Sequence, residues 1–418
     1  MTNTERIQAN NANLREALDM ANNLPDVGGT AEIEEKDITF IDYDGTVLHS
    51  YSFSEVTALT ELPPLPEQEG LICQGWNWDL ADIQGYAARQ QKMYVGAMYI
   101  TDDGKTRVYI SLLPNALSPQ VRFATTGTVL VDWGDGSDTI TVTGTSATSA
   151  KTITHDYAEA GDYIITYEVQ SGAMYLLGSS SGGAYLMYSA DADHRRNYQY
   201  AVRKVELGAN TYCNANYGFG YFAKMETITL PDGLPSLGAG LLNYCYSLKS
   251  VTTPKTVSSE FASRTSWAAE RISLSKGISA IGSNGLRDSA IHYILLPDGL
   301  QSIGSYAFYT VPLKNVVIPE SVEAIDSFAF SACYLMETVT ISNGACTIAA
   351  DAFANCYTVQ YFDFTRCKSV PTLESVDAFD NLSTLCEFRV PANLYDEWIA
   401  ATNWSTYAAQ IVPVRMEG

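Results

Sequence analysis

The feature that most constrains the fold of this chain is a repeat of about 22 residues in its second half. An apolar triplet returns along the chain, and the last residues of successive triplets lie 23, 23, 21, 22, 22, 23 and 23 positions apart. Self-similarity at a fixed period predicts a solenoid, in which each unit buries its apolar side against its neighbours. Such a fold offers a long recognition surface and no obvious catalytic pocket. The triplets are Val205–Leu207, Ile228–Leu230, Val251–Thr253, Ile272–Leu274, Ile294–Leu296, Val316–Ile318, Val339–Ile341 and Phe362–Phe364.

The residue types of one unit predict its structure. Each triplet alternates inward and outward positions, as a half-buried strand does, and a proline after several of them ends the strand without removing a ladder hydrogen bond. A second stretch places small residues before an aromatic ring, which predicts that the ring plugs the inside of the solenoid. We expect Phe308, Phe330 and Phe353 to stack there. The unit from 251 to 271 is degenerate, and Phe261 is its only candidate plug.

The proline steps and the Ala-Phe plugs resemble the BspA-type leucine-rich repeat of bacterial surface proteins, over residues 201–392. The resemblance implies a mainly β solenoid in the C-terminal half and a role in recognition. Residues 393–418 look like the usual ending of such proteins, in which a last strand runs into an amphipathic helix. Trp398 and Trp404 are then expected to seal the last repeat as a C-terminal cap.

Composition excludes several classes of partner. Apolar residues make up 46% of the chain, which is enough to fill real cores, and the length predicts two to four domains. The net charge of −22 repels nucleic acid and anionic lipid, so neither is expected as a partner. The 27 tyrosines suit contacts with sugars or proteins, but they equally suit strands and repeat cores.

The cysteines predict buried free thiols and no metal or cofactor site. The eight cysteines form no Cys-x-x-Cys pair, and only four histidines are present, which disfavours zinc. Seven of the eight lie in the repeats, where a small buried side chain fits, so we expect assembly in a reducing compartment. The sequence shows neither a signal-peptide pattern nor a membrane-spanning stretch of about 18–20 apolar residues.

Residues 1–29 are predicted to form a helix and a linker. Apolar residues recur along one face over residues 4 to 24, and Pro25 with Gly28-Gly29 stops the helix. Asn10 and Asn11 interrupt this face, as polar residues that fix the register of a coiled coil do. Two interpretations stay open: an attachment or oligomerisation helix, which would make a homo-oligomer, or a helix that frays or lies on a neighbouring domain.

Residues 30–119 are predicted to form a small α+β domain. Residues 38–41 and 47–53 indicate a hairpin around Asp44-Gly45, and a short helical turn follows. The hairpin followed later by a Gly-Trp step resembles internalin-type B repeats. The indoles of Trp76 and Trp78 in that step are the candidate ligand-binding residues. We also expect a hairpin turn at Asp102-Asp103-Gly104.

The same hairpin resembles the nucleophile motif of haloacid dehalogenase phosphatases. In that family the residue matching Asp42 attacks phosphorus, and the residue matching Asp44 acts as acid and base beside magnesium. That fold needs a doubly wound parallel sheet with several crossover helices. The chain has no room for such a sheet before residue 120, so this enzyme is a minor alternative.

Residues 120–172 resemble the polycystic-kidney-disease (PKD) β-sandwich domain, through the Asp132–Gly136 turn and the stretch from His155 to Tyr163. Trp133 is a predicted core residue. Asp132, Asp135 and Asp138 are candidate calcium ligands, although acids around a glycine turn are more often ordinary turn residues. Residues 173–200 are rich in Gly, Ser and Tyr and are predicted to cap the N-terminal end of the solenoid.

Taken together, these modules favour a non-enzymatic surface, adhesion or structural protein. Their order resembles repeat proteins of gut bacteria and their phages. The first hypothesis is a phage virion appendage, such as a fibre, decoration or receptor-binding protein, that binds a host cell-surface glycan or protein. In it, the N-terminal helix contacts other virion proteins. The alternative is a bacterial adhesin or interaction protein at the cell surface.

Overall fold

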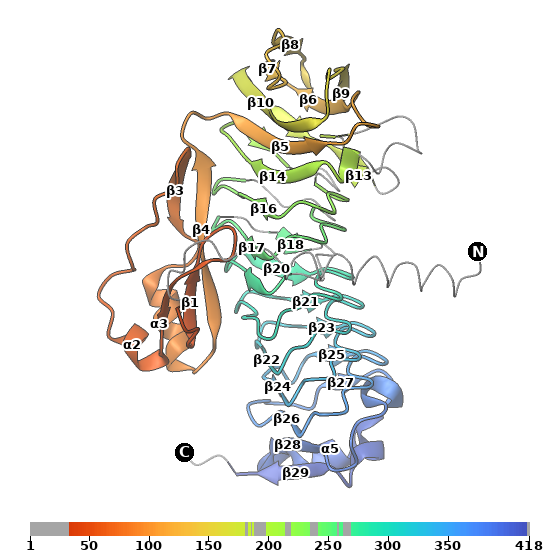
Figure 1. Ribbon diagram of the computed structural model, residues 1–418. Helices are drawn as coiled ribbons and strands as arrows, with labels where there is room; N and C mark the ends of the chain where they lie inside the picture. The colour runs from red at the N-terminus through yellow and green to blue at the C-terminus, as the bar shows by residue number, and fades with distance from the viewer. Residues whose placement is uncertain are drawn as a thin grey trace, which may run out of the picture. The chain divides into compact units, whose positions relative to one another are not determined.

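The computed structural model describes residues 33–179, 183–184, 186–187, 198–213, 219–234, 241–256, 259–261 and 269–415 of the 418-residue chain. The predicted N-terminal helix and the Gly28-Gly29 linker lie outside these ranges. From Glu35 onward the chain forms one compact unit, which is mainly β (Figure 1). The fold class predicted for this part of the chain is therefore confirmed.

The first part of this unit is a small α+β domain. Its sheet has the order β2-β1-β4-β3, with β1 antiparallel to β2 but parallel to β4. Phe40, Trp76 and Tyr99 lie in the core beneath the two helices. The predicted hairpin is therefore present, within a four-stranded sheet that is not doubly wound. The elements are β1 (Ile38–Ile41), β2 (Val47–Tyr51), α2 (Phe53–Thr57), β3 (Leu71–Trp76), α3 (Leu80–Ala88) and β4 (Met93–Thr101).

A sandwich of two sheets follows. Its first strand begins at Thr106, so the boundary predicted at residue 119 lies too late in the sequence. β5 (Thr106–Leu112) does not return along β4, as the expected Asp102-Asp103-Gly104 hairpin required, but pairs with β10 and β14. The turn therefore carries the chain from one domain to the next. The remaining strands are β6 (Gln120–Thr125), β7 (Thr128–Asp132), β8 (Ile140–Thr143), β9 (Ser146–Thr154), β10 (Gly161–Ser171) and β11 (Met174–Leu176).

The sandwich itself covers the N-terminal end of the solenoid. β14 (Val202–Glu206) and β16 (Thr227–Ile228) continue the sheet β5-β10-β7-β8, and β15 (Thr211–Tyr212) joins the sheet β11-β6-β9. One hydrophobic core consequently runs from Val108 to Ile411. The predicted cap segment, residues 173–200, takes part through β11, which pairs with β15, and strands of the sandwich outside that segment cover the same end. Two short strands, β12 (Gly178–Ser179) and β13 (Gly183–Ala184), pair within that segment.

The triplets and the second stretches of the units form separate parallel ladders (Figure 1). The triplet ladder is interrupted between residues 273 and 315, whereas the second ladder is continuous. The triplet strands are β17 (Ser250–Thr252), β19 (Arg271–Ser273), β22 (Asn315–Ile318), β24 (Thr338–Ile341), β26 (Tyr361–Asp363) and β28 (Glu387–Pro391), followed by β29 (Ile411–Val414). The second ladder contains β18 (Ser259–Phe261), β20 (Ile278–Ile281), β21 (Ser302–Ile303), β23 (Ala324–Ile325), β25 (Thr347–Ile348) and β27 (Thr372–Leu373).

The predicted aromatic plugs form a column inside the solenoid. The rings of Phe308 and Phe330 stack at 4.8 Å, and those of Phe330 and Phe353 at 5.1 Å, with interplanar angles of 3° and 1°. Phe379 extends the column, at 5.6 Å from Phe353. The prediction that Phe261 is the plug of its unit was wrong, because Phe261 pairs with Ile281 in the second ladder.

The plug turns are held by a third set of backbone hydrogen bonds between neighbouring units. Phe308 N donates to Ala329 O, and Phe330 N donates to Ala352 O. Each turn needs residues with positive φ just before and just after its plug, for example Tyr306 and Thr310 at 59° and 62°. Tyr306 and Thr310 are both partly exposed, and residues other than glycine rarely adopt this backbone conformation.

The C-terminal cap combines β28, β29 and short helices. Trp398 and Trp404 are both fully buried, and their rings lie 4.8 and 5.5 Å from the ring of Phe364. These indoles close the end of the core, as the sequence predicts. The helices are η1 (Val376–Phe379), η2 (Ala392–Leu394), α5 (Tyr395–Ala400) and η3 (Trp404–Tyr407).

The small α+β domain is docked on the outer face of the triplet ladder, with β4 against β17 and β19 (Figure 1). The amide of Asn77 donates to the carbonyls of Thr253 and Ser273, each at 3.2 Å, and accepts from Gly96 N at 2.9 Å. Leu295 points out of the repeats into the core of the small domain, and its triplet forms no strand. Docking therefore covers this face over the middle repeats and leaves it open farther along.

Candidate binding surface on the repeats

The residues of the phosphatase motif lie in a tight hairpin turn. Asp42 is only 2% exposed, and its two carboxylate oxygens accept from Tyr43 N at 2.8 Å and from Gln68 Nε2 at 2.6 Å. Burial raises the pKa of Asp42. Asp44 accepts from Thr46 N at 2.8 Å. Both side chains therefore stabilise the turn, and the buried carboxylate of Asp42 is not accessible to a substrate.

The predicted binding residues Trp76 and Trp78 are core residues. Both indoles are buried, and Trp76 Nε1 donates to the carbonyl of Pro63 at 3.1 Å. Trp76 packs edge-on against Phe40 and Trp78 against Tyr86. Neither ring has a face available to a ligand.

The candidate calcium residues belong to turns of the sandwich. Asp132 accepts from Gly134 N at 2.9 Å, and Asp135 accepts from Ser137 N at 3.0 Å and pairs with His155 Nε2 at 2.6 Å. Although burial opposes it, these hydrogen bonds lower the pKa of Asp135 to about 2. Asp138 is exposed beside them. The described residues contain no group of three or more His, Cys, Asp or Glu that could hold a metal ion.

An exposed aromatic ridge runs along one edge of the C-terminal repeats. Tyr334 and Tyr357 occupy equivalent positions directly after Cys333 and Cys356, and their rings stack at 6.0 Å and 8°. Their exposed fractions are 51% and 54%, whereas the plug rings of the same units are fully buried. Leu335, next to Tyr334, is also exposed. We call Tyr334, Leu335 and Tyr357 the tyrosine ridge.

The repeat geometry places these side chains outside. The cysteine that precedes each tyrosine is buried, and its thiol donates to the carbonyl of a phenylalanine one unit back, as Cys333 does to Phe308 and Cys356 to Phe330, both at 3.1 Å. The following residue must then point away from the core. Because the two units are consecutive, the two rings are also brought into register.

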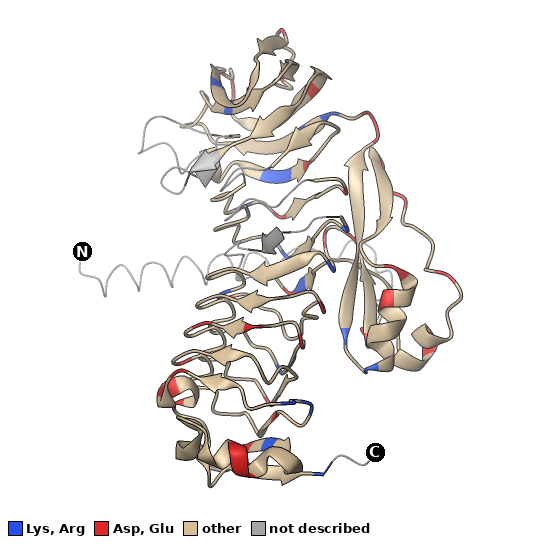
Figure 2. Ribbon diagram, turned by 180° about the vertical axis from the view of Figure 1, so that it is seen from behind, with Lys and Arg blue, Asp and Glu red and all other residues tan. Residues whose placement is uncertain are grey.

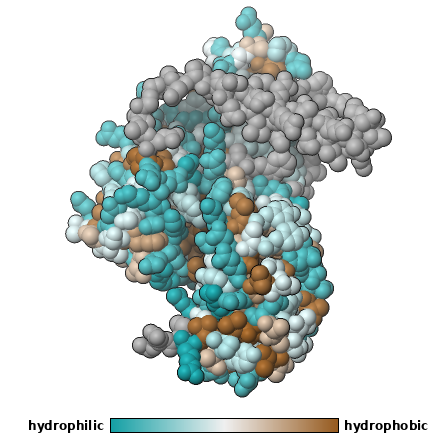
Figure 3. Space-filling model, turned by 60° about the horizontal axis from the view of Figure 1, so that its bottom comes forward, coloured by the Kyte–Doolittle hydropathy of each residue, from teal (hydrophilic) through white to brown (hydrophobic). Residues whose placement is uncertain are grey.

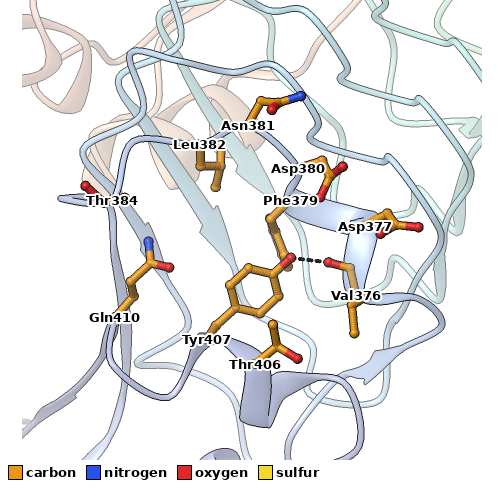
Figure 4. Close-up of a pocket in the computed structure, with 10 residues that line it drawn as sticks. All are labelled: Val376, Asp377, Phe379, Asp380, Asn381, Leu382, Thr384, Thr406, Tyr407 and Gln410. Atoms are coloured by element: carbon orange, nitrogen blue, oxygen red, sulfur yellow. Dashed lines mark hydrogen bonds between the residues drawn. The ribbon is translucent and has the colours of Figure 1, made fainter.

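A pocket lies next to the ridge at the C-terminal cap (Figure 4), with a volume of about 260 Å³. Its floor is formed by the ring of Tyr407, which meets the buried ring of Phe379 edge-on at 5.6 Å. Tyr407 OH donates to the carbonyl of Val376, and burial raises the pKa of this phenol to about 12. The rim is polar and comes from two separate segments of the chain. It carries the side chains of Asp377, Asp380, Asn381, Thr384, Thr406 and Gln410.

Hydrogen bonds join the pocket to the ridge. Asn381, on the rim, donates from Nδ2 to Oδ1 of Asn355 at 3.0 Å, and the same oxygen accepts from Tyr357 OH at 3.0 Å. The pocket and the ridge therefore form one continuous surface. Figure 3 brings this end of the molecule forward and shows apolar patches on an otherwise hydrophilic surface. Leu385 is 86% exposed, which makes it the most exposed of the large apolar residues in the described part of the chain.

Charge on this surface is negative. Asp and Glu are spread over the repeats and the C-terminal helix α5 (Figure 2). Burial, and then the nearby carboxylates of Asp377 and Asp380, raise the pKa of Asp351. Neither the ridge nor the pocket was predicted from the sequence. The exposed Cys-Tyr step of two consecutive repeats is the signal that could have identified the ridge, whereas the pocket leaves no local pattern.

The C-terminal half of the chain is a solenoid with an inner aromatic column. Its repeats are of the BspA leucine-rich type. The family described as BspA type leucine rich repeat region matches in 6 copies, over residues 198–309 and 260–386. A search of curated proteins gives no match, and no helix in the described part of the chain is long and apolar enough to cross a membrane.

Several solved structures are similar to this chain. A leucine-rich repeat protein of T. pallidum shares 26% identity over 34% of this chain and 69% of its own, with a TM-score of 0.31. The pneumococcal vaccine antigen PcpA shares 15% identity over 49% of this chain and 66% of its own, with a TM-score of 0.36. A leucine-rich cell surface protein of Faecalibacterium prausnitzii shares 13% identity over 58% of this chain and 93% of its own, with a TM-score of 0.25.

Proposed function

We propose that this protein is a non-enzymatic adhesion or interaction protein that recognises a glycan or protein of a host surface through its C-terminal repeats. The observation that carries the proposal is the tyrosine ridge. Two stacked rings that are each about half exposed give a rigid amphipathic contact surface at low entropic cost. The buried phenylalanine column fixes their spacing, so the surface is organised before a ligand binds.

The arrangement of the domains supports the same region as the binding surface. The small domain occupies the triplet face over β17 and β19, and the sandwich closes the N-terminal end. The edge that carries Tyr334 and Tyr357 stays accessible. A net charge of −22 favours ligands that are neutral or basic over acidic ones.

Binding to immobilised intestinal mucin from which sialic acid and sulfate have been removed tests the proposal. The double variant Tyr334→Ser/Tyr357→Ser should lose at least tenfold in apparent affinity, because exposed aromatic anchors dominate such interfaces. Tyr200→Ser is the matched control, since Tyr200 is also exposed but lies far from the ridge in the sequence, beside β14. An equal loss in the control, or none in the double variant, would contradict the assignment.

We propose a broader and a more specific location for the protein. A bacterial cell surface is the broader one, and it rests on the type of repeat. A phage virion appendage, with residues 1–29 contacting other virion proteins or forming a homo-oligomer, is the more specific one, and it rests on the resemblance of the module order to phage proteins. Mass spectrometry of purified particles and of washed cells separates the two. Deleting residues 1–28 should abolish incorporation or lower the mass measured by light scattering if that segment is the attachment element.

A further inference from the structure

We propose that the pocket between η1 and η3 binds a single neutral pyranose unit of a glycan whose neighbouring units lie along the tyrosine ridge. This inference rests on the proposed function, because it names the ligand class of the same surface. It goes beyond the proposed function because it names a carbohydrate as the ligand and this pocket as the binding site.

The floor of the pocket suits the apolar face of a sugar ring. The ring of Tyr407 lies open in the centre of the pocket (Figure 4). It is fixed from behind by Phe379 at 5.6 Å and Phe388 at 5.3 Å, and its hydroxyl is held by Val376 O. A ring immobilised in this way loses little entropy when a ligand stacks on it.

The rim carries hydrogen-bonding groups that the fold does not use. Among the described residues, the carboxylate of Asp380 and the hydroxyls of Thr384 and Thr406 have no side-chain hydrogen bond or ion pair, and all three residues are exposed. A carboxylate can accept from two adjacent sugar hydroxyls, and such charge-assisted bonds are the strong ones. The threonines can accept or donate. An aromatic floor with a few polar groups around it is the usual composition of a small-molecule site.

Charge and size narrow the ligand further. Asp377 and Asp380 line the same pocket, so a sugar bearing a carboxylate or sulfate would meet two like charges. A volume of about 260 Å³ lies just below the usual range of ligand pockets, which fits one sugar ring and not an oligosaccharide. The Asn381–Asn355–Tyr357 hydrogen bonds continue the surface outward to the ridge, where further sugar units would stack on the exposed rings.

Saturation-transfer NMR on the full chain tests the inference, with the methyl glycosides of glucose, galactose, mannose, fucose, N-acetylglucosamine and N-acetylgalactosamine as probes. At least one neutral glycoside should bind, and the methyl glycoside of N-acetylneuraminic acid should not. Asp380→Asn should weaken the binding at least tenfold, and Thr406→Val should weaken it less. Asp396→Asn is the matched control, because Asp396 is exposed on α5 and does not line the pocket.

The outcomes separate this inference from the proposed function. If no neutral glycoside binds, or if Asp380→Asn binds as well as the wild type, the sugar site is wrong. Loss of mucin binding in the tyrosine-ridge variant would then still support an adhesion protein with a protein ligand. If monosaccharide binding is lost in Asp380→Asn and retained in the ridge variant, the pocket is the sugar site. Unchanged thermal melting of the variants ensures that the comparison is between folded proteins.

Discussion

Gly96 of β4 lies so close to Thr252 of β17 that a Cβ atom on this glycine would be 2.7 Å from the Cβ of the threonine, and closer still to its side-chain tip. The contact joins the small domain to the repeats across more than 150 residues of sequence. No real side chain tolerates this approach. The glycine is therefore required by docking and not by backbone conformation.

Replacing Gly96 tests how firmly the small domain is docked. Gly96→Ala should destabilise the protein by about 1–3 kcal/mol, since overpacking forces backbone shifts, and hydrogen exchange should rise in β4 and β17. Gly85→Ala is the matched control. Gly85 lies in α3 with no atom within 4 Å of a new Cβ, so this change should be neutral or stabilising by about 0.5–1 kcal/mol. Equal melting temperatures for the two variants would contradict tight docking.

Docking should weaken in acid through Glu35. Although burial opposes it, hydrogen bonds from Arg271, Tyr293 and Tyr94 lower the pKa of Glu35 below its ordinary value of 4.5. A lowered pKa in the folded state contributes stability above that ordinary value, and this stability is lost as the pH falls through the folded-state pKa. The free energy of unfolding of the wild type should thus exceed that of Glu35→Gln at pH 7, and the two should converge below pH 4.5.

Glu270→Gln provides the comparison for this pH dependence. Glu270 lies 3.6 Å from the same Arg271 guanidinium, but its side chain is 58% exposed. Exposed ion pairs contribute little, so the variant should follow the wild-type curve at all pH values. A difference between Glu35→Gln and wild type that is constant from pH 3 to pH 7 would show that the charge of Glu35 is not responsible.

The phenylalanine column should dominate the stability of the C-terminal repeats. Phe330→Ala removes a fully buried ring with a stacked neighbour on each side, and it should cost about 3–5 kcal/mol. Phe328→Ala should cost clearly less, because Phe328 is half-buried and, among the described residues, stacks only on Tyr306, at 4.8 Å. Urea denaturation measures both. Similar urea midpoints for the two variants would show that the column contributes no more to stability than the packing of a half-buried ring outside it.

The cysteine thiols of the repeats should not react with alkylating reagents in the native protein. All eight cysteines are free and the seven in the repeats are buried. Burial raises the pKa of the Cys346, Cys367 and Cys386 thiols to about 12, so almost no reactive thiolate forms at pH 8. Iodoacetamide should label only the half-buried Cys73, slowly, and Cys73→Ser should remove that label. Fast labelling of any repeat cysteine would show that the solenoid opens.

No phosphatase activity is expected from the hairpin motif. Both carboxylate oxygens of Asp42 are engaged by Tyr43 and Gln68 in a buried position. A nucleophile needs an accessible oxygen in line with phosphorus. Hydrolysis of para-nitrophenyl phosphate with magnesium should stay at the buffer rate. A measurable rate that Asp42→Asn abolishes would overturn the non-enzymatic assignment.

Much of the solenoid was predictable because its information is local. The inward positions of the triplets, the Ala-Phe plugs and the buried cysteines recur within each unit of about 22 residues, and a neighbour of the same sequence supplies the complementary surface. The hairpin of the small domain was predictable for the same reason, because the turn residues Asp44-Gly45 lie directly between its two strand-like segments. Trp76 and Trp78 were misjudged because a pair of tryptophans has the same local pattern in a core as on a binding surface.

The sequence by itself determined the repeat, its inner column and its closure by Trp398 and Trp404. Only the tertiary structure decided that β5 leaves the small domain for the sandwich, that the sandwich caps the solenoid, and that the small domain docks on the triplet face. These contacts join residues far apart in the chain, such as Asn77 and Ser273. They depend on complementary shape and on paired polar groups, neither of which leaves a periodic trace in the sequence.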